Sequence, residues 1–310
     1  MFSATRPRPS PASPASSDLT SLLRRFSEAV DGRLSDLLPV ASESGETLVS
    51  AMRAAVLSPG KRMRPALVLL VVHAFGRETE SAVDVACVPE LVHAASLVLD
   101  DLPCMDDAAL RRGHPALHRQ FGEAVAILAA FALLARAQAL LPTALAAAGV
   151  APAHRAGLQQ DFAAVVGALC RGQEADLRLA GAAADLSALE RIHAQKTGAL
   201  FEYAALLGSV VAGVRGAVLE AVLAFARNLG LAFQVSDDIL DARGEGGRLG
   251  KATGRDAALG RTTFVSVFGV AGSETLRDEL IATARQALAP LGAHAQHLNE
   301  LAEYVRTRLS

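Results

Sequence analysis

Residues 18–38 read DLTSLLRRFSEAVDGRLSDLL, and their apolar side chains recur at intervals of three and four positions. This spacing places the apolar residues along one face of an α-helix. The same period returns along most of the chain on a background of Ala and Leu, which favour helix intrinsically. The pattern predicts helices over residues 18–38, 83–102, 118–141, 154–179, 186–193, 199–214 and 217–240.

Gly and Pro interrupt the helical pattern and mark the expected breaks. They fall at residues 59–60, 142, 149–152, 181 and 244–247. Residues 68–72 and 262–270 are crowded with β-branched side chains and are also compatible with strands. No alternation of strands and helices repeats, and no linker divides the chain, so the sequence predicts an all-α, single-domain helical bundle.

The composition argues against several classes of partner. Of the 310 residues, 51% are hydrophobic, 20% are charged and only 4% are aromatic, and the formal net charge is -2. So few aromatic rings, none of them Trp, do not support a platform on which bases stack. The nearly balanced charge argues against a general binder of phosphate backbones, and we expect no nucleic-acid partner.

The mean hydropathy of +0.30 raises the question of a membrane. The longest apolar runs, such as residues 124–135, end at a charge after about a dozen residues, whereas a span needs about 18. We therefore expect no membrane span. The surplus of apolar side chains is expected to form the core or to line an apolar pocket.

The cysteines and the N-terminal segment bear on location. Three cysteines without a C-x-x-C pair fit neither a disulfide framework nor a zinc site, which favours a reducing compartment and a cytoplasmic location. Residues 1–17 are rich in Pro and Ser and lack the apolar core of a secretory signal. We expect a disordered tail there, followed by one domain over residues 18–310; a transit peptide is the alternative.

The chain contains two acidic clusters, each following an apolar segment: Asp100, Asp101, Asp106 and Asp107, and then Asp237, Asp238 and Asp241. The first cluster alone is also compatible with a solvated helix end. The second cluster has no His or Cys nearby in sequence, and oxygen-only clusters of this kind suit a hard ion such as Mg²⁺. Because magnesium usually takes one or two carboxylates and completes its shell with water and phosphate oxygens, two sparse clusters indicate a polyphosphate held between them.

Basic residues occur in separate places around these clusters: GKRMRP at residues 60–65, Arg111 and Arg112, Lys196 with Thr197, and Lys251. Any one of them alone is typical of a solvated basic patch. Their distribution indicates two phosphorylated substrates over an apolar cavity. One diphosphate would be bound through metal, and the other would be held by Lys and Arg.

These residues together resemble the trans-isoprenyl diphosphate synthases, which condense isopentenyl diphosphate with an allylic diphosphate. Residues 100–106 resemble the first aspartate-rich motif, DDxxxxD, and residues 237–241 resemble the second, DDxxD. The similarity continues in ELVHAASLVLDD at residues 90–101, LRRG at 110–113, QKTGALFEYA at 195–204 and LGKATGRDAALGRTT at 249–263. The resemblance implies a bundle of the isoprenoid synthase type with a central cavity, three magnesium ions per site and a homodimer.

The resemblance also implies roles for individual residues. The metal ligands would be Asp100, Asp106, Asp237 and Asp241, with Asp101 and Asp238 in the catalytic set. The isopentenyl diphosphate pocket would contain Lys61, Arg64, His93 and Arg112. The allylic diphosphate would be held by Arg111, Lys196, Thr197, Gln234 and Lys251. Arg261 stands where the family usually has Lys, and Ala108 and Ala109 stand where many relatives extend the acidic run.

Product length is expected to depend on the helix that leads into Asp100. Ser96 and Ala95 lie four and five positions before it, on the face that points beneath the allylic tail. Relatives that stop at fifteen carbons often carry a bulky aromatic there, so the small residues predict geranylgeranyl diphosphate, the C20 product of bacterial carotenoid-pathway synthases. The alternatives are a farnesyl diphosphate synthase (C15), a non-catalytic synthase subunit and a terpene cyclase.

Overall fold

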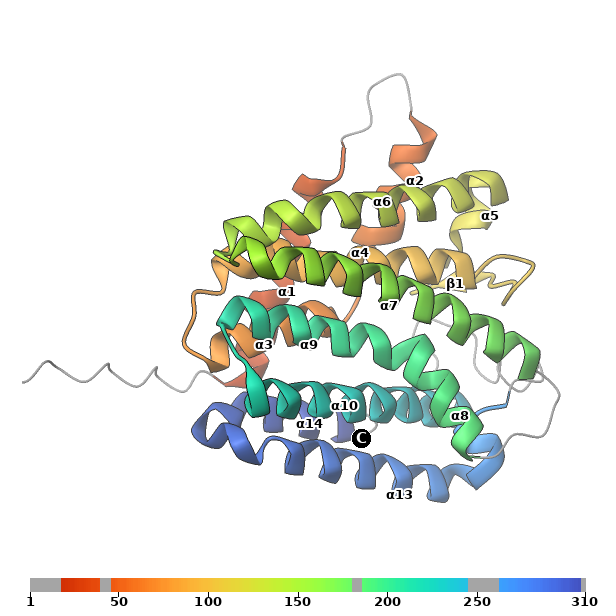
Figure 1. Ribbon diagram of the computed structural model, residues 1–310. Helices are drawn as coiled ribbons and strands as arrows, with labels where there is room; N and C mark the ends of the chain where they lie inside the picture. The colour runs from red at the N-terminus through yellow and green to blue at the C-terminus, as the bar shows by residue number, and fades with distance from the viewer. Residues whose placement is uncertain (1–17, 40–45, 180–185, 245–261, 308–310) are drawn as a thin grey trace, which may run out of the picture.

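The computed structural model describes residues 18–39, 46–179, 186–244 and 262–307. The described chain is almost entirely helical (Figure 1). Its longer helices are α1 (Leu19–Leu37), α2 (Thr47–Leu57), α3 (Met63–Ala74), α4 (Val83–Asp100), α6 (Glu123–Ala147), α7 (Pro152–Leu179), α9 (Ala199–Ala212), α10 (Gly216–Ala242), α13 (Phe264–Ala287) and α14 (Gln296–Thr307). Shorter elements are η1 (Glu80–Ala82), α5 (Leu117–Phe121), α8 (Leu186–His193), the π-helical turn η2 (Ala194–Gly198) and η3 (Ala289–Ala295).

The long helices stack in layers, which confirms the predicted helical bundle (Figure 1). The most extensive packing joins α10 to α13, α4 to α6 and α3 to α9. Two strands of two residues each, β1 (Leu110–Arg111) and β2 (His114–Pro115), pair antiparallel just after α4. This small hairpin carries two of the predicted basic residues back toward the first acidic cluster.

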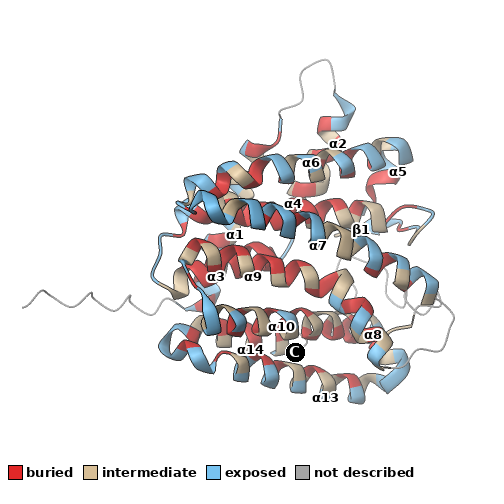
Figure 2. Cartoon of the chain, in the orientation of Figure 1, coloured by how far each residue is buried: buried red, intermediate tan, exposed pale blue. Residues whose placement is uncertain are grey.

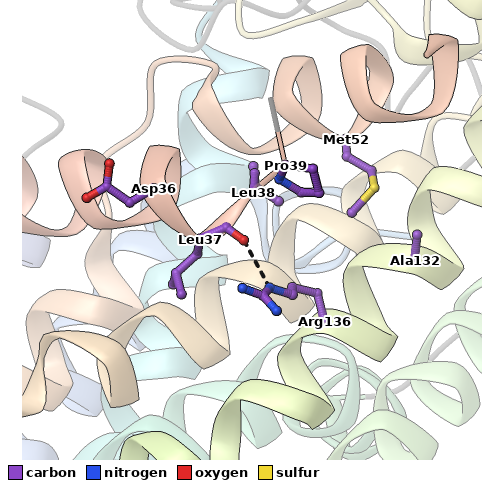
Figure 3. A pocket seen from close by; sticks show the side chains of 7 residues that line it. All are labelled: Asp36, Leu37, Leu38, Pro39, Met52, Ala132 and Arg136. Atoms are coloured by element: carbon purple, nitrogen blue, oxygen red, sulfur yellow. Dashed lines mark hydrogen bonds between the residues drawn. The ribbon is translucent and has the colours of Figure 1, made fainter. Parts of the chain in front are cut away.

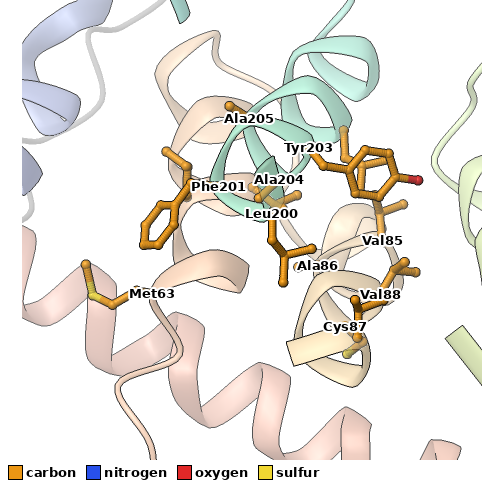
Figure 4. Packing of buried hydrophobic residues seen from close by; sticks show 14 of the residues in the cluster. Met63, Val85, Ala86, Cys87, Val88, Leu200, Phe201, Tyr203, Ala204 and Ala205 are labelled. Carbon is orange, nitrogen blue, oxygen red and sulfur yellow. The ribbon is translucent and has the colours of Figure 1, made fainter. Parts of the chain in front are cut away.

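The core lies where α3, α4 and α9 meet. Buried side chains concentrate on these central helices (Figure 2), and Figure 4 shows Val85 and Val88 of α4 close to Leu200 and Tyr203 of α9. The Tyr203 hydroxyl donates to the Leu158 carbonyl at 3.0 Å, which ties α9 to α7. Such close packing is what an Ala- and Leu-rich sequence with few large rings can achieve.

The two segments that were compatible with strands are helical. Residues 68–72 lie within α3, and residues 264–270 begin α13. Every residue from Val68 to Val72 is fully buried, so the segment is apolar on all sides and shows no helical period. At Gly208 of α9 the backbone comes so close to α3 that an added Cβ would lie 2.7 Å from the Val68 carbonyl oxygen.

The break expected at Pro142 is also wrong, because α6 continues through it to Ala147. The N-terminal boundary of this helix differs too. Gly122, with φ +84°, separates the short α5 from α6, so the single helix expected over residues 118–141 is two. Glycine is required there because a side chain would be strained at that φ.

Three described segments have the length and apolar composition of a membrane span: Glu80–Asp100, Glu123–Ala147 and Gly216–Ala242. The expectation that no apolar stretch is long enough was therefore wrong in that respect. It failed because the run in α6 continues past Arg136, its single charge after Glu123, to Ala147. In the first segment 67% of the apolar window is buried inside the protein, and in the other two 39%.

Candidate active site

The first acidic cluster forms where α4 ends and the chain folds back on itself. The amide of Asp106 donates to the Asp100 carbonyl at 3.0 Å, and the amide of Ala108 donates to the Asp101 carbonyl at 3.0 Å. Asp107 adopts a left-handed φ of 45°, which completes the tight turn. The backbone thereby brings the partly buried Asp106 beside the partly buried Asp100.

Asp101 has a different environment from its neighbours. Its carboxylate is buried and accepts hydrogen bonds from Arg111 of β1, with Nε at 2.9 and 3.0 Å from the two oxygens. Burial alone disfavours the charged guanidinium, but the bond from Asp101 and the charges of Asp100 and Asp106 raise the pKa of Arg111 above its ordinary value. Arg111 is therefore a fixed cation facing the first cluster.

The second cluster lies on the last turns of α10. Asp238 is buried; one oxygen accepts from Gln234 Nε2 at 2.9 Å and the other accepts from the backbone N–H of Phe264 at 3.0 Å. Asp238 therefore anchors the first residue of α13. Asp237 and Asp241 are partly buried and stand one helical turn apart.

A chain of hydrogen bonds links this cluster to the π-helical turn η2. Thr197 Oγ1 donates to Gln234 Oε1 at 2.9 Å, and Gln234 in turn donates to Asp238. The preceding residue, Lys196, donates from Nζ to Asp176 Oδ2 of α7 at 2.6 Å. The wider turn of a π-helix places Lys196 and Thr197 toward different neighbours, and such turns are frequent at functional sites.

The residues predicted to bind the second diphosphate, Lys61, Arg64, His93 and Arg112, lie around the start of α3, on α4 and in the β1–β2 turn; they are called the second basic pocket here. Arg64 is buried, its guanidinium lies 4.8 Å from the centre of the Phe201 ring, and its Nε has no hydrogen-bond partner among the described residues. Burial lowers the pKa of Arg64 to about 10 despite the attraction of Glu90 and Asp237. Arg64 therefore lies within electrostatic range of the second acidic cluster.

His93, Arg112 and Lys61 are the other predicted members of this pocket. Burial, together with the charges of Arg64, Arg112 and other arginines, lowers the pKa of His93 well below its ordinary value, so the ring is neutral near pH 7. Arg112 lies in the turn between β1 and β2 and donates from Nη1 to Ser58 Oγ at 3.1 Å. Lys61 is exposed in the turn that precedes α3.

The predicted chain-length residues lie one turn before the first cluster. Ala95 is fully buried in the core cluster that α4 shares with α6. Ser96 is partly buried, and its hydroxyl donates to the His93 carbonyl at 2.9 Å. Lys251 and Arg261, two further predicted cations, lie outside the described residues, as does the predicted tail at residues 1–17.

The sequence predicted no role for four polar side chains that the fold brings to the site: Arg62 and Glu90, which lie inside the quoted motifs, and Gln173 and Asp176, which lie outside them. Gln173 donates to the sulfur of Met105, inside the first acidic loop, at 3.7 Å, and within the described part of the chain its Oε1 has no hydrogen-bond partner. Gln173 and Asp176 stand three apart on one face of α7 and are both buried. Polar residues at that spacing, in positions that a helix would fill with apolar side chains, were the available signal.

The donor set fits magnesium. Asp100, Asp106, Asp237 and Asp241 supply carboxylate oxygens only, from two separate helix ends, which suits a hard ion that takes few protein ligands. Within the described ranges, no three acidic, His or Cys side chains already form a metal-sized group. Magnesium held there would therefore need further oxygen ligands, such as those of water or a diphosphate.

A separate pocket of about 420 Å³ lies away from these residues, between α1, α2 and α6 (Figure 3). It is lined by Asp36, Leu37, Leu38, Pro39, Met52, Ala132 and Arg136. Arg136 Nε donates to the Leu37 carbonyl at 3.0 Å across it. None of the predicted site residues contributes to this pocket.

Residues 46–301 match the family model described as polyprenyl synthetase. Geranylgeranyl pyrophosphate synthase 10 of Arabidopsis thaliana, described as mitochondrial, is 39% identical over 84% of this chain and 76% of its own length. Farnesyl diphosphate synthase of Escherichia coli is 41% identical over 84% and 89%. Among solved structures, a Helicobacter pylori geranyltransferase complexed with magnesium and isoprenyl diphosphate aligns over 95% of this chain and 98% of that chain, with a TM-score of 0.82 and 29% identity.

Proposed function

Since the chain belongs to the polyprenyl synthetase family and is a trans-prenyltransferase, we propose that it extends allylic diphosphates with isopentenyl diphosphate to geranylgeranyl diphosphate. The observation that carries the proposal is the position of Arg64. The charges of Glu90, within the second basic pocket, and of Asp237, in the second acidic cluster, both act on the pKa of the Arg64 guanidinium. This proximity of the basic residues to the second acidic cluster supports neighbouring sites for two diphosphates.

The chain's own residues would position the two substrates. Arg111, fixed by Asp101, and Lys196, fixed by Asp176, would bind the allylic diphosphate. An ammonium has three N–H groups, so the bond to Asp176 leaves Lys196 able to donate to phosphate oxygens. These cations would stabilise the charge that develops on the leaving diphosphate.

Asp100, Asp106, Asp237 and Asp241 would hold the magnesium ions, for which we propose three per site. Bound there, magnesium would neutralise charge on the departing diphosphate. The H. pylori geranyltransferase complex contains magnesium, which supports this assignment for a relative of 29% identity.

Lys61, Arg64, Arg112 and neutral His93 would hold isopentenyl diphosphate with its double bond facing C1 of the allylic cation. A neutral imidazole can donate one N–H without adding charge to an already basic pocket.

The new carbon–carbon bond forms from the double bond, and the condensed cation then loses a proton. The departed diphosphate would accept that proton, because the carboxylates nearby are ion ligands or are already bonded.

The C20 product is tested by incubating purified protein with isopentenyl diphosphate, Mg²⁺ and each allylic starter in turn. We expect dimethylallyl, geranyl and farnesyl diphosphates all to be extended to C20. Absence of elongation from farnesyl diphosphate would overturn the C20 proposal and leave the prenyltransferase activity intact. Dependence on isopentenyl diphosphate separates this activity from a terpene cyclase, and activity of the chain alone separates it from a non-catalytic subunit.

A C15 product is the second candidate, because the farnesyl diphosphate synthase of E. coli is as similar to this chain as the geranylgeranyl synthases are. The small, buried Ala95 favours C20 over C15, since a methyl group occupies little of the space beneath the allylic tail. The same assay distinguishes the two products by chromatography.

We also propose that the enzyme is a homodimer formed through α6. Leu128 and Phe131 of this helix are 57% and 64% exposed, an unusual position for large apolar side chains. Ala132 and Arg136, one and two turns beyond Leu128, line the pocket in Figure 3, so the exposed face and the pocket are continuous. Light scattering should give twice the chain mass, and Phe131→Asp should give the monomer.

A cytoplasmic location is a further proposal. It rests on three free cysteines, of which Cys104 and Cys170 are exposed. Exposed thiols are best preserved in a reducing compartment. Fractionation of cells that produce the full chain tests the location directly.

A further inference from the structure

Arg62 lies between two residues of the proposed isopentenyl diphosphate pocket, Lys61 and Arg64, yet it faces away from solvent. Only 2% of its side chain is exposed. Its Nε pairs with Asp31 of α1 at 2.6 Å and its Nη1 pairs with Glu90 of α4 at 2.6 Å. A buried guanidinium with two carboxylate partners is not available to bind a substrate.

The same guanidinium also closes the turn that carries Lys61. Its Nη2 donates to the carbonyls of Val56 at 2.9 Å and Ser58 at 3.2 Å, at the end of α2. Arg62 itself has a left-handed φ of 45°, which non-glycine residues rarely adopt. The side chain's four bonds hold this backbone conformation and therefore the direction in which α3 begins.

Glu90 extends the arrangement to Arg112. Its Oε1 lies 2.6 Å from Arg62 Nη1 and 4.0 Å from Arg112 Nη2. Arg112 also contacts the turn, through Ser58 Oγ, and its guanidinium would lie 2.9 Å from a Cβ added to Gly60. The α2–α3 turn, the β1–β2 turn and α4 are thus joined through one buried carboxylate.

The charges of the buried arginines also indicate that Glu90 holds this cluster together. Arg64 and Arg112 both have a pKa below the ordinary value because they are buried, and in both cases Glu90 is the strongest attraction that opposes this shift. Without a buried anion, several guanidinium groups packed together would repel one another. Glu90 makes such a cluster possible in the absence of substrate.

We propose that Arg62 and Glu90 are positioning residues that preassemble Lys61, Arg64 and Arg112 into the anion pocket for the homoallylic diphosphate. The proposal rests on the proposed function for the identity of that substrate. Neither residue touches substrate; both act through the cations that they hold. Preorganisation of this kind lowers the cost of binding a flexible, charged ligand.

The test compares Arg62→Lys and Glu90→Gln with wild type in steady-state assays. Lys keeps the charge and loses the planar fork, and Gln keeps the shape and loses the charge. We expect the KM for isopentenyl diphosphate to rise about tenfold or more in each, with the KM for farnesyl diphosphate within about twofold of wild type. Equal changes in both KM values, or no change for isopentenyl diphosphate, would overturn the proposal.

Arg33→Lys is the matched control. Arg33 of α1 also makes a forked pair, with Nε at 2.5 Å and Nη2 at 3.0 Å from the oxygens of Asp84 on α4, but it lies outside the pocket. We expect neither KM to change in this variant. If Arg33→Lys raised the KM for isopentenyl diphosphate as much as Arg62→Lys does, then any contact of α1 or α2 with α4 would have the same effect. That result would overturn the positioning role of Arg62.

Direct binding of inorganic pyrophosphate without metal, measured by calorimetry, separates this proposal from the proposed function. If wild type shows no prenyl transfer, the proposed function fails, and weaker pyrophosphate binding by Arg62→Lys than by Arg33→Lys still supports the positioning role. Equal binding by the two variants would overturn it. Thermal melts identify unfolded protein; should Glu90→Gln fail to fold, Arg62→Lys decides the question.

Discussion

At the scale of single residues, the aspartates of each motif divide into two groups. Asp101 and Asp238 are buried and their oxygens are taken by Arg111, Gln234 and a backbone amide. Asp100, Asp106 and Asp237 are partly exposed toward the site. Adjacent carboxylates in one motif therefore have different environments, and we propose separate tasks for them: one stabilises the fold and the other binds ions and substrates.

Replacing Asp237 and Asp238 in turn should separate the two tasks. Asp237→Asn should reduce turnover by about a hundredfold or more and leave the free energy of unfolding within about 0.5 kcal/mol of wild type. Asp238→Asn should lose about 1–3 kcal/mol, because the contacts to Gln234 and the Phe264 amide lose a charged acceptor. Urea unfolding and product formation measure both. Equal loss of stability in the two variants would contradict the division.

Asp101→Asn should leave Arg111 without its buried partner. Breaking such a pair is expected to cost about 3 kcal/mol, and activity should fall with it, since Arg111 would no longer be held toward the first cluster. Glu174→Gln is the control. Its pair with Arg178 is exposed on both sides, so the change in unfolding free energy should stay below about 0.5 kcal/mol.

At the scale of elements, the site depends on how closely α7 approaches the π-helical turn. A Cβ added to Gly172 would lie 2.4 Å from the backbone nitrogen of Lys196, so no side chain fits there. The missing side chain lets Asp176, one turn further along α7, reach the Lys196 ammonium. A glycine within a helix, ordinarily unfavourable, is here a requirement of the site.

Gly172→Ala should therefore destabilise the protein by about 1–3 kcal/mol through overpacking and should raise the KM for the allylic substrate as Lys196 is displaced. Gly157→Ala on the same helix is the matched control, because nothing lies within 4 Å of its added Cβ. That variant should gain up to about 1 kcal/mol from helix propensity. Thermal melts and allylic KM values distinguish the two; a neutral Gly172→Ala would contradict the close approach.

We propose that α4 controls the length of the product. Ala95→Phe should place a ring beneath the allylic tail and shift the main product from C20 to C15, with overpacking that costs about 1–3 kcal/mol of stability. Product chromatography is the measurement. An unchanged product spectrum in a folded variant would show that another helix closes the cavity.

For the whole molecule, the period of α1 predicted its helix, whereas α3 stayed ambiguous between helix and strand, and α2, α14 and most of α13 were not predicted. Residues 18–38 show a clear period because α1 has an exposed face. In α3 every residue from Met63 to Val72 is buried, so burial removes the period from which a helix is inferred. The spacing of apolar residues in the sequence does not show how many other helices will surround a segment.

Local motifs predicted most residues of the candidate site, but they did not predict the long-range pairs that hold those residues. The aspartate clusters and Lys61 stand in recognisable groups. Glu90 is separated from Arg62 by 28 positions, and Asp176 from Lys196 by 20, although both pairs lie at 2.6 Å. Only the packing of α4 against α3, and of α7 against η2, creates these contacts.

The stability of the whole molecule should decrease as the pH falls from about 7 to 5, and the sign follows from linkage. Burial, with the charges of His297 and Arg25, lowers the pKa of His73, and burial with nearby arginines lowers that of His93. Below the ordinary histidine pKa, the unfolded chain therefore binds protons that the folded protein does not. Urea unfolding at several pH values should show this loss, and His73→Gln should flatten part of it. A second decrease should begin near pH 4.5, because hydrogen bonds from His297 and Gln296 lower the pKa of Glu300 despite its partial burial, and the folded state resists its protonation. Stability independent of pH from 7 to 5 would contradict the neutral state of both histidines.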